Sequence, residues 1–136
     1  MFETFEHTAD IGLRASAPDL NKLFAEAGRG FTSLLVADLN SVRTRESVVI
    51  EIAGQQLEYL LFDWLNELLH LFECRRLLFS DFEIQVGGHG LNAIALGEPV
   101  AVARHALEHE VKAVTYHGLK LEHSPYGYLA EVILDI

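Results

Sequence analysis

The chain has 136 residues; half are apolar, 22% are charged, and 20 acidic residues against 10 basic ones give a net charge of −10. This length predicts a single domain, residues 1–136, and this balance excludes a disordered chain. The acidic excess argues against the usual mode of nucleic-acid binding, in which Lys and Arg neutralise phosphates. Cations or basic protein surfaces are the expected partners.

Two further features bear on location. The first four residues carry neither the basic nor the apolar region of a signal peptide. The longest apolar stretch, residues 59–72, is too short and too often interrupted by polar residues to span a bilayer. The chain is therefore expected in the cytoplasm and away from membranes.

Its one cysteine, Cys74, cannot form an internal disulfide. We expect a structural role for it at the end of a core helix, without a histidine partner close in sequence.

In chain order, alternating apolar residues predict a first strand over residues 2–7 and a second through Ile11, Leu13 and Ala15. A short break, residues 8–10, separates them. Residues 18 and 19, Pro-Asp, are typical of a helix start, and apolar residues then follow helical spacing to residue 35. Gly28 and Gly30 oppose this helix, because each costs about 1 kcal/mol in a helix interior.

The second half begins with a strand over residues 48–52 and the strongest helix in the chain, residues 55–73. Strands over residues 77–86 and 91–96 flank a glycine-rich hairpin turn at residues 87–90. Alternation over residues 111–121 and 128–136 predicts two more strands. The resulting fold class is α+β: one domain with a mixed β-sheet and two α-helices packed on one face.

Carboxylates mark two places where a metal ion could bind. The last predicted strand runs to Asp135 and Ile136, where a side-chain carboxylate and the terminal carboxylate would repel each other unless a cation lay between them. Such oxygen-rich sites suit Mg²⁺, Ca²⁺ or Mn²⁺. His7 and Asp10 border the break after the first strand. From spacing alone, an exposed chain end and a self-capping turn explain these residues at least as well.

A third polar segment, residues 105–118, contains His105 and His109 at helical spacing, but the HExxH motif is absent. In an alternating strand, Lys112 would share a face with Val114, and His117 would lie on the other face. Solvated strand residues are the simpler interpretation. The sequence carries no P-loop, GxGxxG, GxSxG or paired CxxC motif.

Four segments together resemble the archease family: FEHTADIGL at residues 5–13, DWLNELL at 63–69, EVKAVTYHGL at 110–119 and AEVILDI at 130–136. They span essentially the whole chain in order and at matching separations. The chain departs from the family pattern at two places, and both concern the outline of the partner-facing surface. Tyr128 stands where tryptophan is expected, and residues 97–107 do not align clearly.

The resemblance implies a non-catalytic accessory protein that activates an RtcB-type RNA ligase in tRNA splicing and RNA repair. It promotes guanylylation and multiple turnover of the ligase, which itself holds the RNA. The resemblance also implies a divalent metal site (Ca, Mg or Mn) at Asp10, Asp135 and Ile136. His7, Lys112 and His117 are expected to face the ligase. The alternatives are a metal-dependent hydrolase, with His7 or His117 as base, and a general protein chaperone.

Overall fold

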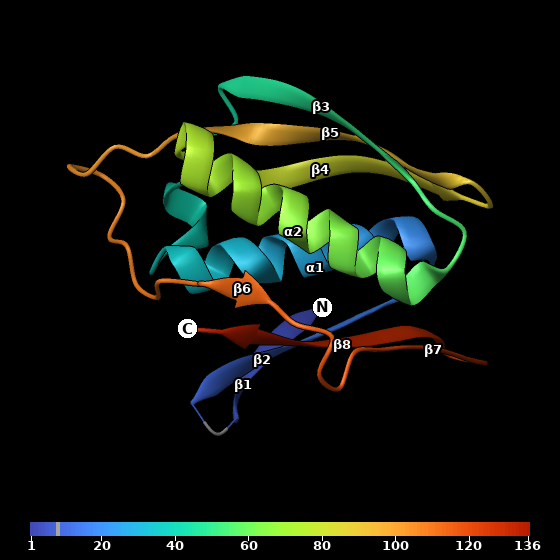
Figure 1. Cartoon of the computed structure of the whole chain (residues 1–136). Helices are drawn as coiled ribbons and strands as arrows, with labels where there is room; N and C mark the ends of the chain where they lie inside the picture. Colours follow the sequence, from blue (N-terminus) through green and yellow to red (C-terminus); the bar gives the residue numbers. More distant parts are fainter. Residues whose placement is uncertain (8) are drawn as a thin grey trace.

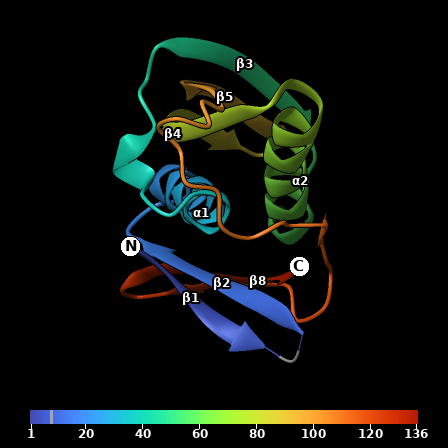
Figure 2. The ribbon, with the colours of Figure 1, turned by 90° about the vertical axis from the view of Figure 1, so that its left-hand side faces the viewer.

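The computed structural model describes residues 1–7 and 9–136, with only the backbone of His7. Within these residues, two antiparallel sheets enclose a layer of two helices (Figure 1). The view along α1 shows one sheet above this helix and the other below it (Figure 2). The described residues include no helix long and apolar enough to cross a membrane.

The lower sheet has the order β1-β2-β8-β6, and β7 also pairs with β8. The upper sheet has the order β3-β5-β4. The strands are β1 Phe2–His7, β2 Asp10–Ala17, β3 Glu46–Ala53, β4 Leu77–Gly87, β5 Gly90–Pro99, β6 Ala113–Val114, β7 Lys120–Ser124 and β8 Gly127–Asp135. The helices are α1 Leu20–Leu35, α2 Leu57–Arg75 and the short 3-10 helix η1 Leu39–Ser41.

The α+β class is confirmed, but the single mixed sheet is corrected to two antiparallel sheets with the helices between them. Gly28 and Gly30 of α1 explain the difference. A Cβ at Gly28 would lie 2.8 Å from the Phe82 ring of β4, and one at Gly30 would lie 2.5 Å from Leu13 of β2. Each glycine thus lets a sheet approach α1 closely, one from each side. The cost of glycine in the helix is offset by packing on two faces.

Local signals place the start of α1 and the core as expected. Asp19 caps α1, since its carboxylate accepts a hydrogen bond from the Lys22 amide at 2.8 Å. Trp64 of α2 has no exposed surface, and its indole N–H donates to the Phe24 carbonyl of α1 at 2.9 Å. This bond ties the two helices together inside the apolar core.

The predicted strand over residues 111–121 is wrong. β6 is only Ala113–Val114, and β7 begins at Lys120. Between them, the Leu119 amide bonds to the Tyr116 carbonyl at 3.2 Å, and Gly118 has a φ of 65°. Glycine permits this left-handed conformation, which reverses the chain and splits the alternating run into two short strands.

Candidate functional site

The register of the lower sheet brings the two predicted aspartates together. Asp10 at the start of β2 lies directly opposite Asp135 at the end of β8. Side chains directly opposite in an antiparallel pair share one face, and like charges in such a pair are destabilising. The position of these carboxylates is therefore suited to a cation between them.

The same face shows how this sheet places a cation between acids. Four residues along, Arg14 lies between Glu3 and Glu131 of the neighbouring strands, with contacts of 2.6 and 2.8 Å. The hydrogen bonds that Arg14 donates to Glu3 and then to Glu131 raise the pKa of Arg14 above its usual value. In the row that contains Asp10, its partners on the neighbouring strands are Asp135 on β8 and His7 on β1. The side chain of His7 lies outside the described residues.

Beside this row is an open pocket of about 830 Å³. Its lining is rich in acidic residues and includes two of the three predicted metal residues and one predicted partner-facing residue. The pocket is lined by Glu6, Ala9, Asp10, Ile11, Glu108, His109, Glu110, Lys112 and Ile136. Carboxylates at this density favour divalent cations or the basic side chains of a partner.

One wall of the pocket is an irregular segment, residues 106–112, that is held by backbone hydrogen bonds at both ends. The Glu108 and His109 amides donate to the end of α1, to the Leu35 and Leu34 carbonyls, at 2.9 and 3.0 Å. The Lys112 amide donates to the Asp135 carbonyl at 2.7 Å. This wall is therefore positioned by α1 and by the last strand.

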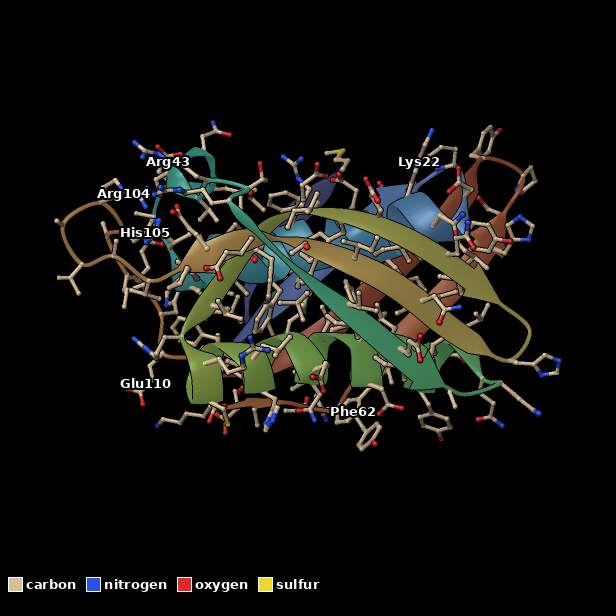
Figure 3. The ribbon with its side chains drawn as sticks, turned by 90° about the horizontal axis from the view of Figure 1, so that it is seen from above. Lys22, Arg43, Phe62, Arg104, His105 and Glu110 are labelled. Atoms are coloured by element: carbon tan, nitrogen blue, oxygen red, sulfur yellow. The ribbon has the colours of Figure 1, made fainter. Side chains whose placement is uncertain are left out.

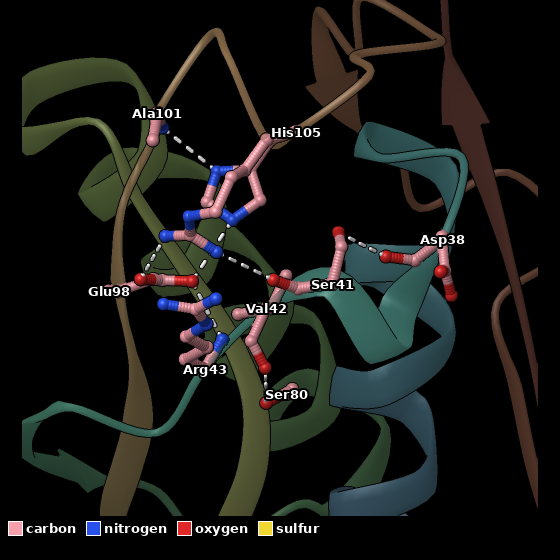
Figure 4. A network of polar contacts seen from close by, with 9 residues as sticks. Asp38, Ser41, Val42, Arg43, Ser80, Glu98, Ala101 and His105 are labelled. Carbon is pink, nitrogen blue, oxygen red and sulfur yellow. Dashed lines mark hydrogen bonds and ion pairs between the residues drawn. The ribbon is translucent and has the colours of Figure 1, made fainter.

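The segment that leads to this wall is held by Glu98, whose carboxylate is buried (Figure 4). Its Oε2 accepts the Arg43 amide at 2.7 Å and lies 3.0 Å from His105 Nε2; its Oε1 accepts Arg104 at 2.5 Å. Arg43, Arg104 and His105 gather at the end of the molecule where Glu110 also lies (Figure 3).

The partners of this carboxylate set its charge state and the histidine tautomer. The Ala101 amide donates to His105 Nδ1 at 2.8 Å, which places the ring proton on Nε2, facing Glu98. Burial would raise the pKa of Glu98, but the hydrogen bonds from Arg104, the Arg43 amide and His105 outweigh it and lower the pKa to about 2. His105 thus has a structural role.

The predicted residues do not all meet at the pocket. Asp10, Lys112 and Ile136 line it. Asp135 is not among the lining residues, but it lies directly opposite Asp10 in the sheet. His117 lies in the turn after β6 and is not among the lining residues. His7 cannot be placed, because its side chain is not described.

The strand that carries Asp135, β8, is an inner strand of the sheet, with β2 on one side and β6 and β7 on the other. The two histidines at helical spacing have different roles, since His105 is buried against Glu98 and His109 lines the pocket. An irregular chain, unlike a helix, does not bring residues four apart onto one face.

Within the residues that the structure describes, no group of three or more His, Cys, Asp or Glu side chains is close enough to hold a metal ion. A metal at Asp10 and Asp135 would therefore need a further ligand, and Ile136, which lines the same pocket as Asp10, carries a carboxylate that could supply it. Carboxylate oxygens of this kind fit a hard divalent ion.

Sequence reasoning missed Glu6, Glu108 and Glu110 as lining residues. The acidic residues clustered just before Lys112 could have indicated this lining. Interpreting the segment as a strand instead placed them at solvent-exposed positions. Chemically, the pocket offers carboxylates, Lys112 and the imidazole of His109. It can bind cations and basic groups, and His109 is its candidate general base.

Known proteins match the chain over nearly its full length. A profile of the archease protein family (MTH1598/TM1083) matches residues 2–136. The archease of Methanopyrus kandleri is 39% identical over 139 residues, with 99% of each chain covered. The archease of Pyrococcus abyssi is 36% identical over 140 residues, covering 99% of this chain and 98% of its own.

Two solved structures share the fold. The solution structure of Methanobacterium thermoautotrophicum protein 1598 has a TM-score of 0.87 and 34% identity, covering 99% of this chain and 98% of its own. A crystal structure from Thermotoga maritima, called an archease and possible chaperone, has a TM-score of 0.61 and 20% identity, with 98% and 96% covered. The second likeness concerns the fold alone.

Proposed function

Because the chain belongs to the archease family, we propose that it is a metal-binding accessory protein that activates an RtcB-type RNA ligase without catalysing the ligation. The observation that carries the proposal is the opposition of Asp10 and Asp135 beside an acidic pocket that also contains Ile136. The activation takes the form of faster guanylylation and repeated turnover of the ligase, in tRNA splicing and RNA repair.

The metal in this proposal is Ca²⁺, Mg²⁺ or Mn²⁺, held by Asp10, Asp135 and the carboxylate of Ile136. The donor set supports this choice, since it consists of carboxylate oxygens from neighbouring strand positions. When bound, the ion neutralises the adjacent carboxylates and fixes the end of β8 against β2. Lys112, which also lines the pocket, is left to contact the ligase or its nucleotide.

The partner surface is acidic, and this supports a protein partner over RNA. The net charge of −10 and the four acidic residues lining the pocket would repel a phosphate backbone. A basic rim around the nucleotide pocket of a ligase would instead be attracted, and long-range attraction speeds the encounter. The ligase therefore holds the RNA. His7, Lys112 and His117 are the proposed contacts with it.

The deciding experiment measures guanylylation of a cognate RtcB-type ligase under multiple-turnover conditions, with and without this protein. We expect the wild type to stimulate the ligase and Asp135→Asn to lose most of the stimulation, because one proposed metal ligand loses its charge. Asp63→Asn, an exposed acid on α2, is the matched control and should stimulate like the wild type. In calorimetric titration with Ca²⁺, Asp63→Asn should bind the ion like the wild type, and Asp135→Asn should bind it more weakly.

Full stimulation by a folded Asp135→Asn protein would exclude this site from the activity. A wild-type protein that fails to stimulate would instead refute the activator function itself. The alternative is then a metal-dependent hydrolase, for which His7 or His117 was the expected base; His109, which lines the pocket, is a further candidate. Nucleotide turnover by the isolated protein, lost in Asp10→Ala, would support that enzyme. Chelator-insensitive suppression of aggregation would support a chaperone.

A further inference from the structure

Helix α2 carries a cysteine and a histidine side by side on its exposed face. His70 and Cys74 are four residues apart, one helical turn, and both side chains are exposed. The Cys74 sulfur lies 3.5 Å from His70 Nδ1. This corrects the expectation that Cys74 has no histidine close in sequence, and Cys74 is exposed instead of buried in the core.

The spacing of these two atoms matches that of a metal chelate. A tetrahedral zinc ion with a Zn–S bond of about 2.3 Å and a Zn–N bond of about 2.0–2.1 Å separates its sulfur and nitrogen ligands by roughly 3.5 Å. The observed separation between Sγ and Nδ1 is 3.5 Å. The two atoms are therefore already at the separation that a shared metal ion requires.

We propose that His70 and Cys74 form a two-ligand site for a borderline or soft divalent cation, with Zn²⁺ and Cd²⁺ as its best fits. A thiolate and an imidazole select such ions over Ca²⁺ and Mg²⁺, which prefer oxygen. The site thus differs in metal preference from the carboxylates of Asp10 and Asp135. It lies on a different element and does not depend on the proposed function.

The helix fixes the backbone positions of the pair before the metal arrives. Leu68, Leu69 and Leu71 of the same turns are buried in the core, which fixes the backbone from which both ligands project. A preorganised chelate loses little conformational freedom on binding. Binding forms the S–metal bond, and the thiol proton passes to the buffer.

The site has open coordination positions. In the described part of the chain, no third His, Cys, Asp or Glu side chain joins the pair to make a closed metal cluster. A tetrahedral ion would therefore keep two positions for water or for a small thiol ligand. Open positions distinguish this site from closed structural zinc sites.

Titration of the reduced full-length protein with Cd²⁺ tests the proposal, because cadmium bound to thiolate gives an ultraviolet charge-transfer band. We expect the wild-type band to saturate at one ion per chain and Cys74→Ser to abolish it. His70→Gln should weaken binding by at least about tenfold, since an imidazole ligand is lost. The exposed hairpin histidine provides the control, and His89→Gln should bind like the wild type.

Competition separates this site from an oxygen site. Zn²⁺ should displace Cd²⁺, whereas a large excess of Ca²⁺ should leave the band unchanged. Absence of a band in the wild type would overturn the proposal and leave a simple S–H···N hydrogen bond. Wild-type affinity in a folded His70→Gln protein would also overturn it, because the thiol would then bind alone. Circular dichroism confirms that each variant keeps its helices.

Discussion

The buried carboxylate of Glu98 should make the protein sensitive to acid in a way that one substitution removes. The pKa of Glu98 is about 2 in the folded protein, against 4.5 for an ordinary glutamate. Since one pKa unit corresponds to about 1.36 kcal/mol, the ionised form contributes roughly 3 kcal/mol to the free energy of unfolding. Because the folded pKa is the lower one, this contribution is present above about pH 4.5 and is lost as the pH falls towards 2.

Glu98→Gln keeps the size of the side chain and removes the charge that Arg104 and the Arg43 amide contact. At pH 7 we expect the variant to unfold about 3 kcal/mol more easily than the wild type. This difference should shrink steadily below pH 4.5 and approach zero near pH 2. Urea unfolding followed by circular dichroism at a series of pH values measures it.

Glu51→Gln, an exposed acid on the neighbouring strand β3, is the control and should stay within about 0.5 kcal/mol of the wild type throughout. A Glu98→Gln penalty that is the same at pH 7 and near pH 2 would refute the reasoning. It would mean that the shape of the side chain, and not its ionised form, supports the segment leading to the pocket.

Three further outcomes follow from the packing and the pocket. Trp64→Phe should lower the free energy of unfolding by about 2–3 kcal/mol in urea titrations, because the buried Phe24 carbonyl loses its donor and a void remains. Gly97→Ala should cost about 3 kcal/mol or more, since its Cβ would lie 1.8 Å from the Leu78 carbonyl oxygen; Gly87→Ala, with nothing within 4 Å, should shift the melting temperature little. Lys112→Ala should leave stability within about 0.5 kcal/mol while reducing ligase stimulation, and an unchanged guanylylation rate would remove Lys112 from the partner surface.

Elements with strong local patterns were predictable from sequence. The helix expected over residues 55–73 is α2, Leu57–Arg75, and the glycine-rich turn joins β4 and β5 as a hairpin. Both depend on interactions within a few residues, namely helical spacing of apolar side chains and turn conformations available to glycine. The short β6 and β7 were misjudged because alternation continues through Gly118, where the chain turns.

The division of the strands into two sheets could not be predicted, because it depends on contacts between distant segments. Gly28 and Gly30 read locally as defects in a helix. Only the presence of Phe82 on one side and Leu13 on the other reveals them as positions of close approach. The broad apolar face of α2 was consistent with burial, but it did not say how many sheets would cover it.

The candidate site was predictable only in part. Asp10 and Asp135 lie at opposite ends of the chain, and nothing in their spacing says that they are register partners. The local pattern marked them as two separate candidates, and only the family resemblance joined them into one site. The acidic wall at Glu108 and Glu110 was missed because its conformation comes from backbone bonds to α1 and β8, with no regular period in sequence.

Asp135 connects the two halves of this site through different atoms. Its backbone carbonyl accepts the Lys112 amide and so holds the pocket wall, while its side chain shares a face with Asp10. Substitution of the side chain leaves the carbonyl and the strand register in place. Loss of ion binding in Asp135→Asn can therefore occur without loss of the wall, whereas Glu98→Gln weakens the support of the wall and leaves the carboxylates intact. The two variants together separate the charge of the site from its shape.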